Sequence, residues 1–289
     1  MRPVHLLYIA AILALAACQE RISLSTEDSA PGLVIYGYIT TDTTAHAVRI
    51  TRSSGYFAQT PPQGISGADV SIASPNATYP LSESPSEPGL YLTEPDVYGL
   101  TGESYTLRVS LDFGGKGRSE DYEATTTIMP PPELDSIGFS PFTAHDRIIQ
   151  VMVWGRMPQT TDVNYFSSYL YINGRLYNDS LSRIRLNNDR FLIAGREIKA
   201  MPLFFLNQDR NRSKLSAGDT VSVQLDGIPG DYSAFLYNAQ GETQGSNPIF
   251  DGPPANVPSN IRSLAAGSST LVLGFFGSRS KSIGSVVYE

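Results

Sequence analysis

The residue whose type and position point most directly to a reaction is Cys18, the single cysteine of the 289-residue chain. It follows Arg2 and an apolar run at residues 6–17, which has the length of a signal-peptide core. Residues 15–18 read LAAC. Small residues before a cysteine form the motif at which bacterial lipoproteins are cleaved and the sulfur takes up a diacylglycerol. We therefore expect residues 1–17 to be a signal peptide and Cys18 to be the lipidation site, with membrane lipid as its partner.

An ordinary cleaved signal and an uncleaved anchor are the alternatives for this N-terminus. The apolar run is short for a transmembrane helix, and no second cysteine competes for the lipid. Several acyl chains on one residue hold a protein on a bilayer far better than one chain does. Residues 19–32 are polar, so residues 18–32 are expected to be the lipidated cysteine and a flexible tether.

Side chains that commonly serve in catalysis are scarce in the rest of the chain. Only His46 and His145 remain after signal removal, and neither lies in a Gly-x-Ser-x-Gly or His-Glu-x-x-His motif, so both are expected at the surface. Residues 120–123 (EDYE) form the densest acidic cluster, for which a solvated strand edge is a simpler interpretation than a glycosidase pair. Residues 209–213 resemble a calcium loop, but their arginines would repel the cation. The sequence predicts no catalytic, cofactor-binding or metal site.

The composition indicates a folded, acidic protein, with 41% hydrophobic and 17% charged residues and a net charge of −7. A negative charge argues against nucleic acid as a partner. The charge is split, since residues 31–144 carry thirteen acids and five bases (net −8) and residues 145–214 carry six acids and eleven bases (net +5). This asymmetry predicts two surfaces with different electrostatic preferences, unless the bases are scattered, solvated side chains.

The first half of the mature chain consists of short alternating runs separated by turn residues. Val, Ile, Thr and Tyr at period two favour antiparallel strands, here at residues 34–39, 47–51, 68–72, 89–92, 105–111 and 122–128. Residues 114–117 (GGKG) are expected to form a hairpin tip. We predict an immunoglobulin- or transthyretin-like β-sandwich at 33–129, ended by a proline hinge at 130–134.

The second half, residues 135–289, is predicted to be a second β-rich domain with one short helix. Strands are expected at residues 147–154, 165–172, 220–225, 270–276 and 285–288. Asp231 is expected to cap a helix over 232–239, where apolar residues recur at three- and four-residue spacing. Tyr165, Phe166, Tyr169 and Tyr171 place rings on both faces of one strand. Core packing is the preferred role for most members of the set formed by the sixteen tyrosines and the single tryptophan, Trp154.

Nine short motifs and the cysteine occur in an order that resembles the DUF4249 lipoproteins of Bacteroidota. They are LVIYGYI (33–39), VRITR (48–52), GADV (67–70), PGLY (88–91), YTLRV (105–109), LDSI (134–137), NP (247–248), NI (260–261) and GFFG (274–277). The resemblance covers nearly the whole mature chain. It implies a lipid-anchored outer-membrane protein that serves a TonB-dependent receptor as an accessory subunit. Residues 19–21 (QER) carry fewer acids than the surface-export signals of that phylum, which leaves open the leaflet that Cys18 occupies.

The resemblance also directs attention to acids followed by hydroxyl residues, which Bacteroidota O-glycosylate in exported proteins. The candidate sites are Ser29, Thr43, Ser136, Ser180 and Thr220. An aspartate before Ser or Thr is also common in turns and at strand starts. We expect Ser29, in the tether, to be the modified residue if any is.

Together these observations predict a non-enzymatic outer-membrane lipoprotein, an accessory or ligand-delivery subunit of a TonB-dependent transporter, whose ligand is unknown. The alternatives are a stand-alone surface adhesin or structural module, and a hydrolase with an unrecognised carboxylate site. The expected contact surfaces are the proline-rich loop at 244–260 and the basic stretch at 183–214.

Overall fold

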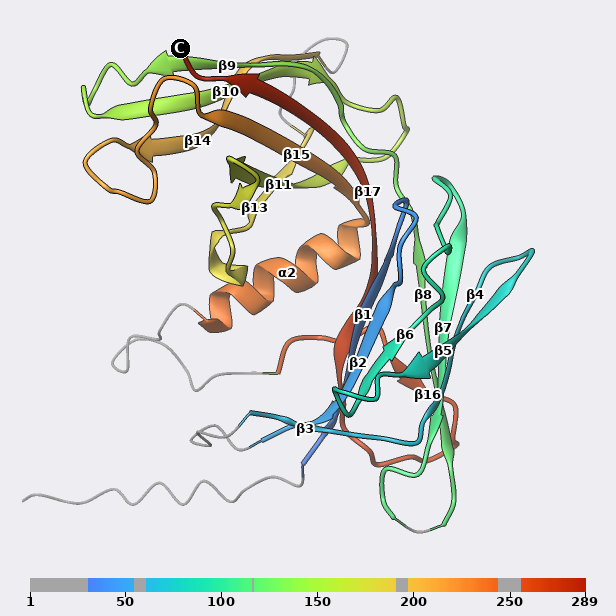
Figure 1. Ribbon diagram of the computed structural model, residues 1–289. Coiled ribbons are helices and arrows are strands. Elements are labelled where there is room, and N and C mark those ends of the chain that lie inside the picture. The colour runs from blue at the N-terminus through green and yellow to red at the C-terminus, as the bar shows by residue number, and fades with distance from the viewer. Residues whose placement is uncertain (1–30, 55–60, 116, 191–196, 244–255) are drawn as a thin grey trace, which may run out of the picture. The chain divides into compact units, whose positions relative to one another are not determined.

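A computed structural model describes residues 31–54, 61–115, 117–190, 197–243 and 256–289 (Figure 1). Cys18 and Ser29 lie outside this part of the chain. The strands of the first half are β1 (Leu33–Thr40), β2 (Ala47–Arg52), β3 (Gln63–Gly64), β4 (Asp69–Ala73), β5 (Thr78–Glu83), β6 (Leu90–Leu92), β7 (Ser104–Leu111) and β8 (Glu120–Thr127). The six strands predicted there are all confirmed.

The second half is also mainly β. Its elements are β9 (Glu133–Pro141), β10 (Ile148–Arg156), β11 (Tyr165–Ile172), β12 (Arg175–Leu176), η1 (Leu181–Arg183), β13 (Arg185–Asn188), β14 (Glu197–Asn207), β15 (Thr220–Ile228), α2 (Gly230–Thr243), β16 (Arg262–Ser263) and β17 (Val272–Val287). The predicted fold class, mainly β with one short helix, is confirmed. None of the described helices is long and apolar enough to cross a membrane.

Most strands belong to one fourteen-stranded sheet with the order β12-β11-β15-β17-β1-β2-β6-β5-β4-β7-β8-β16, with β13 and β3 paired at its sides. In the first half, β5 pairs with both β6 and β4, so the sheet turns back on itself. Strands on both sides of this turn contribute to one core that contains Ile35, Ile50, Ile72, Leu107 and Tyr122. The immunoglobulin- or transthyretin-like identity of this half stays a prediction.

The glycines between β7 and β8 have the backbone conformation that the sequence predicts for a hairpin tip. The hairpin between β7 and β8 carries Gly115 at φ 64° and Gly117 at φ 69°. These left-handed conformations favour glycine because it lacks a Cβ atom. The glycine-rich segment therefore acts as a hairpin tip.

The long strand β17 joins the two halves of the sheet, and Figure 1 shows it curving between them. It pairs in parallel with β1 up to Arg279 and antiparallel with β15 from Ser280 onward. The prediction of separate strands at 270–276 and 285–288 is wrong, because residues 277–284 have strand partners too. Their serines and charged residues resemble a loop in the sequence but are spaced at period two.

In the second half, the three-stranded sheet β14-β10-β9 packs on one face of β11, β15 and β17. The core between these layers contains Val151, Phe204, Leu170 and Val223. Along β15, Val221, Val223 and Leu225 are in this core, so the intervening Ser222, Gln224 and Asp226 face the opposite side of the sheet.

Helix α2 lies on that opposite side, as Figure 1 shows. Tyr232 and Leu236 are buried in a third cluster with Ile228 and Phe275. The predicted helix is confirmed, but it begins two residues earlier than expected, so Asp231 lies in the first turn rather than at the cap. The Asp231 carboxylate accepts a hydrogen bond from the Tyr232 N–H at 2.8 Å, and an acid in this position suits the helix dipole.

Residues 32–289 form one compact unit. Most buried apolar residues before 130 and most after 134 lie in different cores, but Ile261 and Phe276 of the second segment belong to the first core. Strand β17 of the second segment also pairs with β1 of the first. The independence of 33–129 and 135–289 as folding domains stays a prediction.

Candidate functional site

A cleft of about 720 Å³ lies between the sheet and α2. We call it the aromatic cleft, and define it by Tyr36 and Tyr38 of β1, Tyr169 of β11, Tyr232 and Phe235 of α2, Arg279 of β17, and the segment 176–184. Aliphatic side chains, including Val34, Leu181 and Leu273, form the walls of the cleft between these residues. The volume and lining are those of a small-molecule site, in which apolar walls surround a few polar groups.

The sheet side of the cleft follows from strand register. Tyr36 and Tyr38 of β1 lie beside Phe275 and Gly277 of β17, and Arg279 is two residues further along the same face. The alternate residues of β1, such as Ile35, are buried in the first core. Period-two alternation thus puts the apolar face of β1 in the core and its tyrosines in the cleft.

Arg279 is the one arginine or lysine among the described residues that line this cleft. Its guanidinium carbon lies 3.8 Å from the centre of the Tyr38 ring, which is a cation–π contact. Its Nη1 donates to the Tyr169 hydroxyl at 3.3 Å and lies 3.7 Å from Oδ2 of Asp226. Its Nε atom is buried without a hydrogen-bond partner among the described residues. Arg279 is therefore held from two sides with part of its donor capacity unused.

Asp226 lies behind Arg279 on β15 and is only 1% exposed. Its Oδ1 accepts a hydrogen bond from Gln224 Nε2 at 2.7 Å. Burial raises the pKa of Asp226 to about 6, although Arg279, Gln224 and Lys281 oppose the rise. Asp226 is not among the residues that line the cleft, so the cleft presents the arginine and not its counter-ion.

The helix side of the cleft is built by stacked rings. The Tyr36 and Tyr232 hydroxyls lie 2.9 Å apart in a hydrogen bond. Phe235 packs against Phe275 with ring centres 4.8 Å apart and against Tyr36 at 6.3 Å. A Cβ atom at Gly277 would come within 2.8 Å of the Tyr232 ring, so glycine is required for this close approach.

The segment 176–184 is fixed to both the sheet and the helix. Asn178 is buried, accepts from the Leu170 N–H at 2.9 Å and donates to the Ser168 carbonyl at 2.9 Å. Gln240 of α2 donates to the carbonyls of Leu181 and Ile184 at 2.9 and 2.8 Å. Fixed walls keep a binding site open without a ligand, which lowers the entropic cost of binding.

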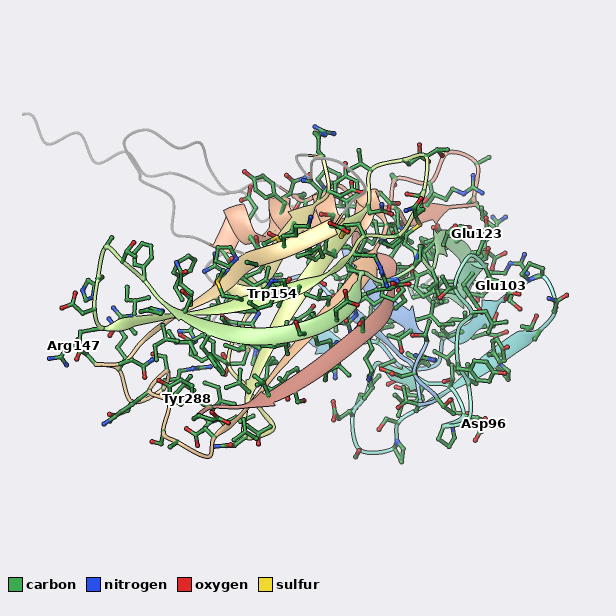
Figure 2. The ribbon with its side chains drawn as sticks, turned by 90° about the horizontal axis from the view of Figure 1, so that it is seen from above. Asp96, Glu103, Glu123, Arg147, Trp154 and Tyr288 are labelled. Carbon is green, nitrogen blue, oxygen red and sulfur yellow. The ribbon has the colours of Figure 1, made fainter. Side chains whose placement is uncertain are left out.

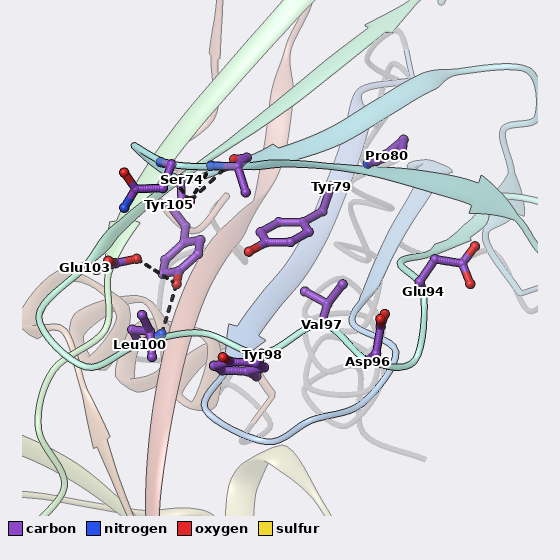
Figure 3. Close-up of a pocket in the computed structure, with 12 residues that line it drawn as sticks. Ser74, Tyr79, Pro80, Glu94, Asp96, Val97, Tyr98, Leu100, Glu103 and Tyr105 are labelled. Carbon is purple, nitrogen blue, oxygen red and sulfur yellow. Dashed lines mark hydrogen bonds between the residues drawn. The ribbon is translucent and has the colours of Figure 1, made fainter.

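A second, smaller hollow of about 370 Å³ lies in the first half (Figure 3). Glu94, Asp96 and Glu103 surround it. Tyr105 accepts from the Leu100 N–H at 2.9 Å and donates to Glu103 at 3.2 Å, so its hydroxyl is satisfied within the fold. The aromatic cleft is twice as large and contains unused donors. It is therefore our candidate site.

Groups for acid–base or metal chemistry are not gathered in this cleft. Among the described residues, no three His, Cys, Asp or Glu side chains are grouped to hold a metal ion. The expectation that His46 lies at the surface is wrong, because it is 2% exposed in the first half. Its Nε2 has no hydrogen-bond partner in the described part of the chain, and burial lowers its pKa. His145 is exposed, as predicted.

The candidate glycosylation residues are scattered. Thr43, Ser136, Ser180 and Thr220 are all exposed, and Ser180 lines the aromatic cleft. Residues 244–255 of the proline-rich loop lie outside the described residues, whereas Asn256 and Val257 line the cleft.

The expected charge asymmetry between two surfaces stays a prediction. In Figure 2, Asp96, Glu103 and Glu123 lie away from Arg147. Within the basic stretch, Arg183 and Arg212 both pair with Asp179, at 3.5 and 2.6 Å. Part of the positive charge of this stretch is thus neutralised within the fold.

Sequence reasoning missed Arg279 and Asp226. A weak signal exists, since Asp226 directly follows the alternating Val221, Val223 and Leu225 in a run of small and apolar residues and is buried on the opposite face of the strand. The sequence does not show that a strand 53 residues further on supplies the guanidinium, because the pairing of β15 with β17 is a long-range contact.

The chain was compared with curated proteins and with models of protein families. No curated protein matches the chain. A family model described as a domain of unknown function, DUF4249, matches residues 19–283, which includes every element that builds the aromatic cleft. The chain therefore belongs to the DUF4249 family.

Proposed function

We propose that this protein is a non-enzymatic, lipid-anchored protein of the outer membrane that binds a small ligand and serves a TonB-dependent transporter as an accessory or ligand-delivery subunit. The observation that supports binding is the aromatic cleft. It combines a volume of about 720 Å³ with mostly apolar walls and one accessible cation.

The anchor and the transporter are supported by the sequence. The LAAC motif at residues 15–18 supplies a lipidation cysteine, and the order of motifs resembles Bacteroidota lipoproteins. A tether of about a dozen residues lets the folded unit move over the membrane surface while it stays near a membrane partner. Anchoring raises the effective concentration at that partner, which suits delivery of a ligand.

Affinity purification from native membranes tests this function. A tagged copy is solubilised in mild detergent, and the recovered proteins are identified by mass spectrometry. The expected result is an outer-membrane transporter in stoichiometric amount, and its loss when Cys18→Ser removes the anchor. Recovery of the wild-type protein without any transporter would contradict the accessory role.

A further inference from the structure

We propose that the aromatic cleft takes a small organic acid, whose carboxylate binds Arg279 and whose apolar body lies between the rings of β1 and α2. This inference rests on the proposed binding function and adds the chemical class of the ligand.

The first reason is the unused donor capacity of Arg279. A guanidinium has five N–H donors in a planar fork that matches a carboxylate. The described residues supply one hydrogen bond, to Tyr169, and an ion-pair contact with Asp226 at 3.7 Å, which is beyond hydrogen-bond distance. Nε is buried and unpaired. Because Nε is enclosed by the fold, a ligand in the cleft meets the outer nitrogens of the guanidinium, and Nη2 has no hydrogen bond among the described residues. A hydrogen bond from a charged donor on a side chain that is only 20% exposed contributes more than one from a solvated arginine.

The second reason is the charge that the cleft presents. Asp226 is 1% exposed and lies behind Arg279, with Oδ1 occupied by Gln224. Asp179, the one acid among the described lining residues, is ion-paired with Arg212 at 2.6 Å. Lys281, beside Asp226 in the register of β15 and β17, is paired with Asp42 at 2.7 Å. The remaining charge that faces the cleft is positive, which favours an anion over a cation.

The third reason is the apolar wall. An inorganic anion would contact Arg279 and leave the rings of Tyr36 and Phe235 uncovered. The lining has five aromatic side chains, and three of its four tyrosine hydroxyls are already hydrogen-bonded, Tyr36 with Tyr232 and Tyr169 with Arg279. Its other uncharged polar side chains are those of Asn178, Ser180 and Asn256. A polyhydroxylated sugar would need many more hydrogen-bond partners than these walls offer. A carboxylate joined to a ring or an alkyl chain satisfies both the arginine and the wall.

Calorimetry with acids and their neutral amides tests the ligand class. The full-length mature chain with Cys18→Ser, which avoids detergent, is titrated with 1-naphthaleneacetate and octanoate. Each acid is compared with its primary amide, and the two bodies report whether a ring or an alkyl chain fits. Because only the acid forms a charged pair with the guanidinium, at least one acid is expected to bind about tenfold or more tightly than its amide.

Variants assign the preference to Arg279. Arg279→Gln is expected to abolish the preference for the acid while the amide still binds. The double variant Asp226→Asn, Arg279→Gln gives the same result without leaving a buried aspartate unpaired. Arg147→Gln is the matched control, since Arg147 is an exposed arginine that pairs with Asp209 at 2.7 Å outside the cleft, and it is expected to bind like the parent.

Three outcomes would overturn the inference. They are equal affinity for acid and amide, no binding of either acid at about 1 mM, and an acid preference that survives in both Arg279 variants. Each of these leaves the membrane purification result untouched, so failure of the ligand class is distinguishable from failure of the proposed function.

Discussion

Replacement of Asp226 by asparagine is expected to change how the stability of the protein depends on pH. The carboxyl is 1% exposed and has Gln224 at 2.7 Å and Arg279 at 3.7 Å. Lys281 and Asp42 also act on it, with opposite signs. Asparagine has nearly the same shape and keeps one acceptor oxygen, so the variant removes the titration with little change in packing.

The magnitude follows from the pKa of this carboxyl. Burial raises it to about 6 in the folded protein, whereas an unfolded chain has a value of about 4. Between these values the folded state holds the proton and the unfolded state has released it. The contribution of Asp226 to stability is therefore largest below about pH 4 and is lost as the pH rises through 6. A difference of about two pKa units corresponds to about 3 kcal/mol.

Urea unfolding of the wild type and Asp226→Asn between about pH 4 and 8 measures this effect. The difference between the two free energies of unfolding is expected to shift by about 3 kcal/mol in favour of the variant as the pH rises. The carboxyls that both proteins contain contribute equally to the two free energies of unfolding, so their titration cancels in the difference.

Asp219→Asn is the matched control for this titration. Asp219 directly precedes β15, and hydrogen bonds from Asn173 and the Ser216 N–H lower the pKa of its carboxyl. Its stabilising effect is present above about pH 4 and is lost only as the pH falls below that value. Between about pH 4 and 8, the difference between the wild type and Asp219→Asn is therefore expected to stay nearly constant. A pH-independent difference between the wild type and Asp226→Asn would refute the assignment of a raised pKa to Asp226.

Three further substitutions test the anchor and the helix. Cys18→Ser is expected to move the protein from the membrane fraction to the soluble fraction and to remove the lipid mass from the intact protein; retention on membranes would contradict the anchor. Gly277→Ala is expected to lower the free energy of unfolding in urea by about 1–3 kcal/mol, since the new methyl group meets the Tyr232 ring at 2.8 Å. Tyr232→Phe, which removes only the hydroxyl bonded to Tyr36, is expected to cost about 0.5–1.5 kcal/mol by the same assay; a larger loss than for Gly277→Ala would contradict these roles.

The strands that the sequence predicts correctly have one buried and one solvated or cleft-facing side. In β7, Tyr105, Leu107 and Val109 are buried and Ser104 and Arg108 are exposed, so alternation alone identifies the strand. The strands β9 and β14 were not predicted. Their pairing with β10 is broken by register shifts, and β14 contains a proline, so the alternation is interrupted.

His46 shows why burial of a single polar residue is harder to predict. It lies between a turn and β2, in a sequence of small and polar residues that resembles a surface loop. The end of β6 and the residue after it lie beside it. The His46 N–H donates to Thr93 Oγ1 at 2.9 Å, and the His46 carbonyl accepts from the Thr93 N–H at 3.0 Å. Thr93 is 47 residues away in the sequence, and no local pattern encodes that contact.

The position of Arg279 follows from how β17 is held on its other face. Ser278 donates to the Thr127 carbonyl at 2.8 Å and accepts from Thr126 at 3.0 Å, and Ser280 donates to the Met129 carbonyl. Both serines are buried against the end of β8, so the residue between them must point into the aromatic cleft. The first half of the protein thereby sets the position of the guanidinium, while β11, β15 and α2 supply its surroundings. A cleft shared in this way exists only when both halves are paired with β17, which explains why neither half alone shows it in its sequence.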